Sequence, residues 1–177
     1  MIYTQKCATP LGRALLASEG ESLCGLWFEG QRHFMRGVKA EKTEEKRLAV
    51  FEAAEDWLER YFRGERPLTK ELPLSPKGSA FAREVWGMLL DIPYGKLTSY
   101  GTLAALYAQR HGLASMSAQA VGGAVGRNPV SIIIPCHRVL AASGSLTGYA
   151  GGLDKKLALL ELEGIDPLHA GEYWHRF

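Results

Sequence analysis

Residues 128–139 read NPVSIIIPCHRV, and this run is the most informative part of the chain. Its apolar segment, 130–134, is rich in β-branched residues, which favour extended backbone, so the pattern predicts a buried strand that ends at the following proline. Cys136, His137 and Arg138 come next. A thiol reacts as the thiolate, and a neighbouring base or cation favours that form, so Cys136 is the candidate nucleophile.

Upstream of this run, the sequence predicts three helices joined by short connections. Ser79, Ser99 and Ser117 can each cap one of them, because a serine hydroxyl accepts a hydrogen bond from the first turn of a helix. The second and third helices, separated by a break near residue 111, resemble a helix-turn-helix. Downstream, a glycine-rich loop over 148–152 leads to a last helix.

The third predicted helix is unusual, because glycine and alanine make up most of residues 118–126. Each glycine costs about 1 kcal/mol relative to alanine in a helix interior. The composition indicates either close packing against another helix or close approach to a further surface, such as a DNA groove. Gln119 and Arg127 are its main long side chains, which suits contacts to shape and phosphate better than reading of base edges.

The first part of the chain has a different pattern. Alternating apolar residues predict short antiparallel strands over 2–5, 13–18 and 23–28. From Leu48 to Phe62, apolar residues recur at three- and four-residue steps, which predicts one amphipathic helix.

Three prolines within residues 67–78 interrupt the chain, because proline cannot continue a helix. We therefore expect an α/β domain with a small antiparallel sheet over 1–76 and a mainly α domain with a helix-turn-helix over 77–177. Of the 177 residues, 23% are charged and 46% hydrophobic, which is typical of a globular protein. The net charge of +2 excludes a highly basic coat protein for nucleic acid but allows a local basic patch.

The three cysteines, Cys7, Cys24 and Cys136, form an odd and sparse set that favours a reducing compartment over a disulfide scaffold. The first twenty residues contain no run typical of a signal peptide or a membrane span, so we expect a cytoplasmic protein, or a nuclear one in a eukaryote. Cys7 and Cys24 with His33 have no standard zinc spacing. We expect no metal and no cofactor.

Catalysis by Cys136 requires a base within reach. On a strand, Cys136 and His137 would point to opposite faces, so a turn or a bridging water is needed between them. Glu161 and Glu163 on the last helix can orient the imidazole. Three other interpretations stay open: an inert buried cysteine, a Cys–His hydrolase with a thioester intermediate, and a DNA-binding regulator that uses only the helix-turn-helix.

Residues 128–139 resemble the active-site signature of the O6-alkylguanine-DNA alkyltransferases, also called methylated-DNA–protein-cysteine methyltransferases. The resemblance covers about residues 79–165 and includes IPYGKLTSY at 92–100, AVGGA at 120–124 and SLTGYAGG at 145–152. It implies a ribonuclease H-like supporting domain for the first part of the chain, which matches only in general character.

The resemblance implies DNA repair by direct reversal of damage. A protein of this family binds double-stranded DNA through a helix-turn-helix in the minor groove and rotates an O6-alkylguanine out of the duplex. It then transfers the alkyl group to a cysteine that is not regenerated. O4-alkylthymine is a further candidate substrate, and the range of alkyl groups is left open. We expect a monomer whose partner is damaged DNA, without membrane association.

Carried over by position, the resemblance gives each site residue a role. It makes Cys136 the acceptor, His137 the base acting through a water, and Glu163 the residue that orients the imidazole. Asn128 would hold the active-site turn, and Tyr100 would face the flipped base and protonate the leaving guanine. The remaining assignments are the walls of the base pocket, Val139, Tyr149 and Ala150, and the DNA-binding residues of the third helix, Gln119, Ala120, Gly122, Gly123 and Arg127.

One of these positions departs from the family pattern. Many members carry an arginine that fills the gap left by the flipped base, where this chain has Gln119. A glutamine can hydrogen-bond the orphaned cytosine, although it is shorter and uncharged. We therefore predict that base flipping is retained, with a weaker salt dependence at this contact.

Overall fold

The computed structural model describes residues 1–177, and its chain divides into two compact units. The first unit contains residues 1–78 together with the short segment 129–133, and the second contains residues 79–128 and 134–177. The chain therefore enters the first unit twice, the second time shortly before Cys136. No helix has the length and apolar character needed to cross a membrane.

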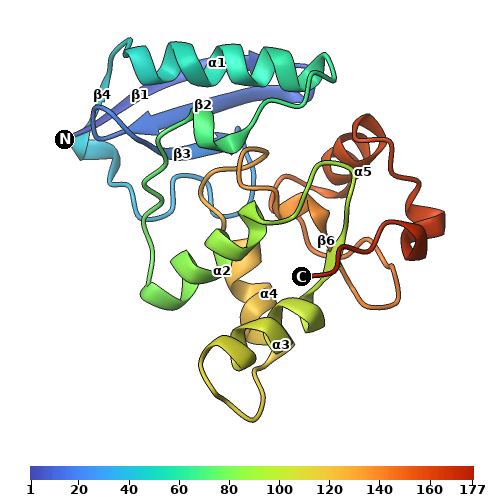
Figure 1. The fold of residues 1–177 in the computed structure, drawn as a ribbon. Helices are drawn as coiled ribbons and strands as arrows, with labels where there is room; N and C mark the ends of the chain where they lie inside the picture. Colours follow the sequence, from blue (N-terminus) through green and yellow to red (C-terminus); the bar gives the residue numbers. More distant parts are fainter. The chain divides into compact units, whose positions relative to one another are not determined.

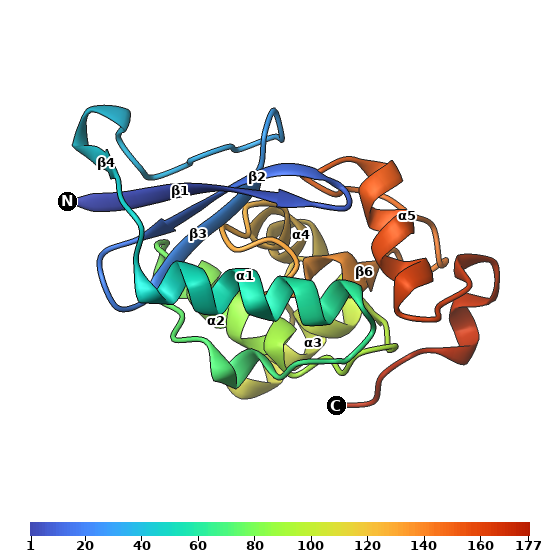
Figure 2. The same ribbon diagram turned by 90° about the horizontal axis from the view of Figure 1, so that it is seen from above.

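The first unit is a four-stranded sheet with one long helix against it (Figures 1 and 2). The strand order is β3-β2-β1-β4, and the three predicted antiparallel strands are confirmed. The fourth strand, β4, pairs parallel to β1 and was not predicted, because its Thr-Glu-Glu sequence lacks an apolar face. The elements are β1 (Ile2–Thr9), β2 (Gly12–Ser18), β3 (Leu23–Phe28), β4 (Thr43–Glu45) and α1 (Ala49–Phe62).

Burial explains why these residues form the core of the first unit. Every residue of β3 is buried, as expected for a strand covered on both faces. At Gly25 an added Cβ would overlap the Trp27 ring, so glycine is required there for the indole to pack. The predicted apolar face of α1 is confirmed, and its buried residues are Val50, Phe51, Ala54, Trp57, Leu58 and Tyr61.

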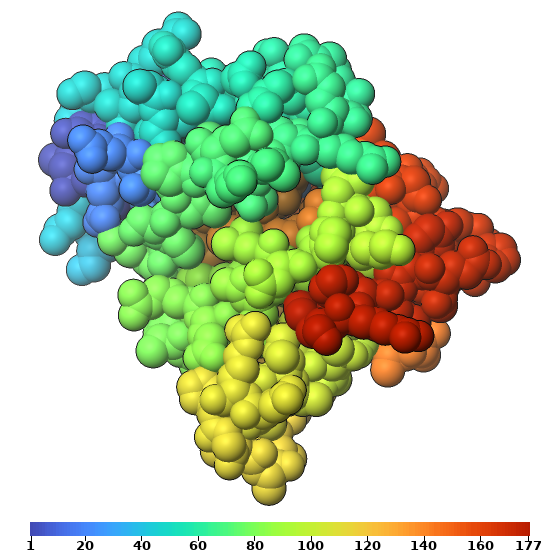
Figure 3. Space-filling view, in the orientation of Figure 1, coloured from blue at the N-terminus to red at the C-terminus, as the bar shows by residue number.

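The second unit is mainly helical and contains α2 (Ala80–Leu90), α3 (Tyr100–Arg110), α4 (Ala118–Gly126) and α5 (Leu153–Leu162). All three predicted serine caps are confirmed. The hydroxyls of Ser79, Ser99 and Ser117 accept from backbone N–H groups at 3.1, 3.0 and 3.1 Å, respectively. The connection over residues 111–117 is mostly exposed (yellow in Figure 3) and longer than the roughly three to four residues of a standard helix-turn-helix.

The predicted strand over 130–134 is wrong. Val130 forms only an isolated bridge, and Ile132 adopts a φ of 70° in a tight turn that the Ile133 N–H closes onto the Ser131 carbonyl at 2.8 Å. This is the strained γ-turn geometry, which is rare for a β-branched residue. All five residues are at most 2% exposed. The apolar pattern therefore predicts correctly that these residues are buried, but it does not establish that they pair as a β-strand.

Candidate functional site

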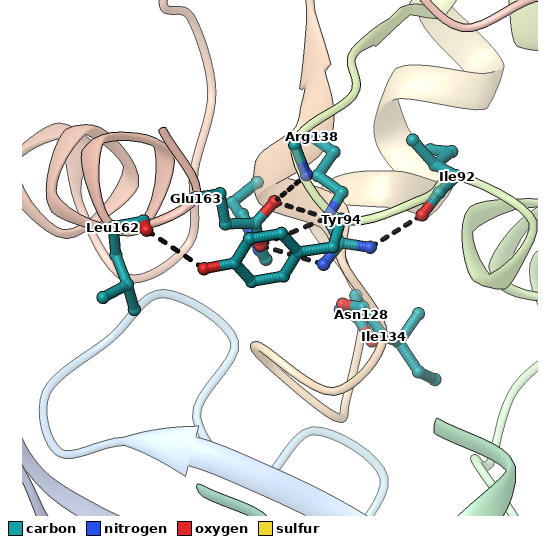
Figure 4. A network of polar contacts seen from close by, with 9 residues as sticks. Ile92, Tyr94, Asn128, Ile134, Arg138, Leu162 and Glu163 are labelled. Atoms are coloured by element: carbon teal, nitrogen blue, oxygen red, sulfur yellow. Dashed lines mark hydrogen bonds and ion pairs between the residues drawn. The ribbon is translucent and has the colours of Figure 1, made fainter. Parts of the chain in front are cut away.

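Cys136 opens a short 3-10 turn, Cys136–Arg138, instead of following a strand. Pro135 has φ −82° and ψ 62°, an inverse γ-turn that the Cys136 N–H closes onto the Ile134 carbonyl at 2.8 Å. The Asn128 side-chain amide donates to the same carbonyl at 2.8 Å (Figure 4). Asn128 thus lies where it can hold the turn that presents the thiol.

The turn also directs His137 into the interior. Its Nε2 lies 2.7 Å from Oε1 of Glu163, and both side chains are 0% exposed. Glu163 follows the last residue of α5, so the end of that helix places its carboxylate behind the turn. Glu161, the other carboxylate considered from the sequence, is exposed and has no place in this pair.

Arg138 is the main partner of the same carboxylate (Figure 4). Its Nε and Nη2 donate to the two oxygens of Glu163 at 2.9 Å each, and its Nη1 donates to the Ile92 carbonyl at 2.7 Å. Our expectation that Arg138 favours the thiolate is therefore corrected, because this cation is already paired with a buried anion. Only its position beside His137 in the sequence hinted at a place in the site.

A glycine lets a further backbone donor reach the carboxylate. The Gly95 N–H donates to Oε2 of Glu163 at 3.1 Å. Gly95 has a φ of 74°, and a Cβ there would lie 3.3 Å from the Glu163 carbonyl oxygen. Both the backbone conformation and the close approach require glycine at this position.

The charges in this network define which imidazole nitrogen is basic. Burial lowers the pKa of His137, against the opposing effect of Glu163. Burial acts to raise the pKa of Glu163, but His137 and Arg138 outweigh it and hold that pKa well below its usual value. The resting pair is a neutral imidazole whose Nε2–H donates to a carboxylate. The other ring nitrogen, Nδ1, is then the one that can accept a proton.

The buried surroundings of Cys136 favour the protonated thiol. Its residue is 6% exposed, and burial raises its pKa. The Asn128 side chain, the Lys156 ammonium and nearby backbone N–H groups act in the opposite direction but do not reverse the shift. The desolvation of a buried thiolate therefore outweighs the groups that stabilise it at rest.

Two tyrosines lie close enough to Cys136 for its charge to raise their pKa values, although burial is the larger cause for both. The Tyr100 hydroxyl donates to the Thr147 carbonyl at 3.0 Å, and its pKa is raised to about 12. The Tyr149 hydroxyl is buried without a hydrogen-bond partner, and its pKa is raised well above its usual value. Of the other predicted pocket walls, Val139 is buried and Ala150 is half-buried.

A hollow of about 530 Å³ opens beside α4. Four of the predicted site residues on α3 and α4 line it: Tyr100, Gln119, Gly122 and Gly123. A Cβ at Gly122 would lie 3.5 Å from the Tyr100 ring, so the lack of a side chain at Gly122 leaves space in the hollow beside that ring. The other lining residues are Ala118, Thr147 and Gly148.

The two remaining α4 candidates lie outside the lining of this hollow. Ala120 is half-buried, and so is Arg127, which follows the end of the helix. The Arg127 guanidinium lies over Gly123, where a Cβ would come within 3.2 Å of Nη1. The Arg127 side chain therefore folds back along α4 to Gly123 and is not part of the lining of the hollow.

The chain matches two family models that together span most of its length. The ribonuclease-like domain of 6-O-methylguanine DNA methyltransferase matches residues 2–76, and the DNA-binding domain of the same family matches residues 80–165. The methylated-DNA–protein-cysteine methyltransferase of Haemophilus influenzae is 41% identical over 170 residues, which cover 96% of this chain and 90% of the relative.

Solved structures agree with the sequence matches. The crystal structure of Mycobacterium tuberculosis OGT in complex with DNA has a TM-score of 0.77 at 40% identity, covering 91% of this chain and 92% of that one. The O6-methylguanine DNA methyltransferase of Methanococcus jannaschii has a TM-score of 0.61 at 27% identity, covering 92% and 94%. Family models, curated relatives and fold therefore agree, and this chain belongs to the 6-O-methylguanine DNA methyltransferase family.

Proposed function

We propose that this chain repairs double-stranded DNA by moving the alkyl group of O6-alkylguanine onto Cys136, once per molecule. The observation that carries the proposal is a single acceptor thiol on a fixed turn, with the His137–Glu163 pair buried behind it at 2.7 Å. Family membership supplies the substrate class, since the relatives are named as methylated-DNA–protein-cysteine methyltransferases. O4-alkylthymine is proposed as a further substrate.

The transfer is a displacement at the alkyl carbon. The bond from Sγ of Cys136 to the carbon forms as the bond from that carbon to O6 breaks, so the electron pair of the broken bond stays on guanine. The thiol proton passes to Nδ1 of His137, directly or through a water. Guanine takes up one proton, donated by the Tyr100 hydroxyl, and the proton held by His137 restores the phenol. Neutral guanine and an alkylated cysteine result.

The protonation states of these residues suit this order of steps. Because burial keeps the thiol protonated, the sulfur becomes anionic only as His137 removes its proton during transfer. Glu163 then stabilises the imidazolium that forms, as a buried carboxylate does for any paired histidine. The raised pKa of Tyr100 keeps its phenol protonated, so it can donate to the leaving base. Its present bond to Thr147 must be exchanged for one to guanine.

The hollow beside α4 supports the DNA side of the proposal. A base inside a duplex must be extruded before its O6 can be reached, at a cost of a few kcal/mol. Small residues along α4 let the helix backbone approach a minor groove closely, and Gln119 lies at the start of the helix, exposed, where it can occupy the vacated space. Tyr100 lines the same hollow and interacts electrostatically with Cys136.

Intact mass spectrometry tests the proposal directly. The protein is mixed with a duplex that carries one O6-methylguanine, and we expect a gain of one methylene per molecule, located at Cys136 by peptide mapping. Cys136→Ser should show no gain, while the matched controls Cys7→Ser and Cys24→Ser should keep it. No gain in the wild type, or repair beyond one equivalent of DNA, would contradict stoichiometric transfer. Turnover would instead indicate a hydrolase-like enzyme.

A further inference from the structure

Tyr94 lies in the middle of the polar network drawn in Figure 4, although the transfer scheme gives it no task. It follows Pro93 in the turn after α2, and the Lys96 N–H closes that turn onto the Pro93 carbonyl at 3.1 Å. Tyr94 is half-buried, and its hydroxyl donates to the Leu162 carbonyl at 3.0 Å. This contact joins segments that are 68 residues apart in the sequence, so it reports how the turn packs against the end of α5.

Leu162 is the last residue of α5, and Glu163 follows it directly. The last carbonyls of a helix have no partner inside the helix, so a donor from outside satisfies the group and fixes where the helix ends. The Tyr94 hydroxyl supplies such a donor one residue before the carboxylate that pairs with His137. The bond to Leu162 therefore limits how far the Glu163 backbone can move away from the imidazole.

The Tyr94 ring contacts the second partner of the same carboxylate. Arg138 ends the Cys136–Arg138 turn (the acceptor turn), and its guanidinium carbon lies 5.8 Å from the centre of the ring, within the range of a cation–π contact. Oε1 of Glu163 accepts from Arg138 Nη2 at 2.9 Å and lies 2.7 Å from His137 Nε2. Because arginine and histidine share this oxygen, the position of the guanidinium affects how the carboxylate meets the imidazole.

Backbone groups of the same turn reach the network on either side of Tyr94. The Ile92 carbonyl accepts from Nη1 of Arg138 at 2.7 Å, and the Gly95 N–H donates to Oε2 of Glu163 at 3.1 Å. Residues 92–95 thus contact the arginine, the carboxylate and the end of α5 together. Tyr94 contributes its side chain where Ile92 and Gly95 contribute backbone groups, so its contacts can be removed by substitution without altering the backbone donors and acceptors.

We propose that Tyr94 is a positioning residue for alkyl transfer that acts through Glu163. Its hydroxyl fixes the end of α5 and its ring fixes Arg138, so the carboxylate stays aligned with His137 while the imidazole takes up the thiol proton. The proposal rests on the proposed function for its role in DNA repair. The link from Tyr94 to the His137–Glu163 pair is a property of the protein alone and can be tested without DNA.

The first test is NMR of the His137 Nε2 proton in protein with isotope-labelled histidine. A proton held between a buried imidazole and a carboxylate exchanges slowly with water and resonates far downfield. Its absence in His137→Gln identifies it among the five histidines of the chain. Tyr94→Phe removes the hydroxyl and keeps the ring, and we expect the resonance to move upfield and to exchange faster. Tyr94→Leu also removes the cation–π contact and should give a larger change.

Tyr3→Phe is the matched control for this measurement. Tyr3 also has a cation over its ring, with Lys46 Nζ 4.9 Å from the centre, but it belongs to the first unit. The control should leave the His137 resonance at its wild-type position. An unchanged resonance in both Tyr94 variants, or equal shifts in Tyr94→Phe and Tyr3→Phe, would overturn the proposal.

Single-turnover transfer from O6-methylguanine DNA tests whether the link serves the reaction. Tyr94→Phe should lower the transfer rate constant at saturating DNA about three- to tenfold, the factor expected for one lost hydrogen bond. The half-saturating DNA concentration should stay unchanged, because Tyr94 acts on the transfer step. A change confined to DNA affinity would contradict the assigned role.

A double variant tests whether Tyr94 acts through the carboxylate. In the Glu163→Gln background, Tyr94→Phe should have little further effect on the rate constant, since the group that it positions has already been replaced. Losses that simply add would show that Tyr94 acts by another route. If the wild type transfers no alkyl group, the proposed function fails, while the NMR result still decides the link between Tyr94 and the His137–Glu163 pair.

Discussion

Replacing Glu163 with glutamine removes the negative charge from the centre of the site while keeping the shape of the side chain. The carboxylate now accepts from Gly95 at 3.1 Å and Arg138 at 2.9 Å, and lies 2.7 Å from His137. In the variant, Arg138, a residue that is 8% exposed in this structure, loses its anion. Breaking a buried ion pair from one side costs about 3–5 kcal/mol, and we expect the free energy of unfolding to fall by that amount.

Urea denaturation measures this loss, and an exposed pair supplies the control. Arg47 and Glu52 are also 2.7 Å apart, but their side chains are 76% and 54% exposed. Such a pair contributes about 0–1 kcal/mol, so Glu52→Gln should change stability by no more than that. Equal losses in Glu163→Gln and Glu52→Gln would refute the reasoning, because they would show that burial adds nothing to the Glu163 interactions.

The same substitution should change the response to acid. Because its partners hold the pKa of Glu163 below the unfolded value of 4.5, the folded protein binds fewer protons than the unfolded chain in that range. The stabilisation is complete above pH 4.5 and is lost as the pH falls toward the folded pKa. Glu163→Gln should therefore lose less stability than the wild type on acidification, and its transfer rate should drop by about 10²–10⁴ because His137 loses the anion that stabilises its protonated form.

Three further substitutions test the backbone conformation at Gly95, the burial of the Tyr149 hydroxyl and the role of Gln119 in repair. Gly95→Ala should destabilise the protein by about 1–2 kcal/mol, because the residue has φ 74° and its Cβ would meet the Glu163 carbonyl at 3.3 Å. The control is Gly87→Ala, on a helix, where an added Cβ has no atom within 4 Å, so this change should instead stabilise the protein by about 0.5–1 kcal/mol. Urea denaturation midpoints measure both changes, and an unchanged stability in Gly95→Ala would contradict the steric argument. Tyr149→Phe removes a buried hydroxyl without a partner, so unfolding should be unchanged or harder by up to about 1 kcal/mol. A clear loss of thermal stability in Tyr149→Phe would reveal a bond to that hydroxyl. Gln119→Ala should slow repair of a duplex lesion while leaving iodoacetamide reactivity of Cys136 unchanged, and unaltered repair would remove Gln119 from base flipping.

Local patterns in the sequence were sufficient for the elements whose stability is local. The three serine caps and the apolar face of α1 depend on neighbours within one or two helical turns, and the structure confirms them. The strand predicted over 130–134 failed because an apolar run reports burial, which the turn at Ile132 satisfies equally well. β4 was missed because its pairing with β1 comes from a distant segment and not from its own Thr-Glu-Glu sequence.

The site shows the same division. The residue pattern indicated Cys136 and His137, with Glu161 or Glu163 as a partner, and the resemblance selected Glu163. The structure places His137 and Glu163 in contact. Neither the pattern nor the resemblance indicated that the Arg138 guanidinium would form an ion pair with Glu163 or that Lys156 would be buried. Both facts depend on how α5 packs against the acceptor turn, which no local periodicity records. The direction of the thiol pKa depends on the same packing, because desolvation is a property of the folded interior.

Burial alone does not distinguish the acceptor from the other two cysteines. Cys7, Cys24 and Cys136 are all buried, and burial raises the pKa of each. The neighbouring groups, however, shift the thiol pKa in different directions. For Cys7 and Cys24, the largest charge effect comes from a carboxylate and reinforces the shift, whereas Asn128 and Lys156 oppose it for Cys136.

This difference suits an acceptor that can react only once. A thiol kept protonated by burial is a poor nucleophile toward adventitious electrophiles and oxidants, because the thiolate is the reactive form. The same thiol must ionise readily when a lesion is in place, and a neutral histidine with a buried carboxylate behind it supplies the base at that moment. A lower resting pKa of Cys136 would speed alkyl transfer, but it would also let oxidants and adventitious electrophiles inactivate molecules that have not yet met a lesion. On this argument a raised resting pKa, opposed by Lys156 and released through His137, is the arrangement that a single-use acceptor requires.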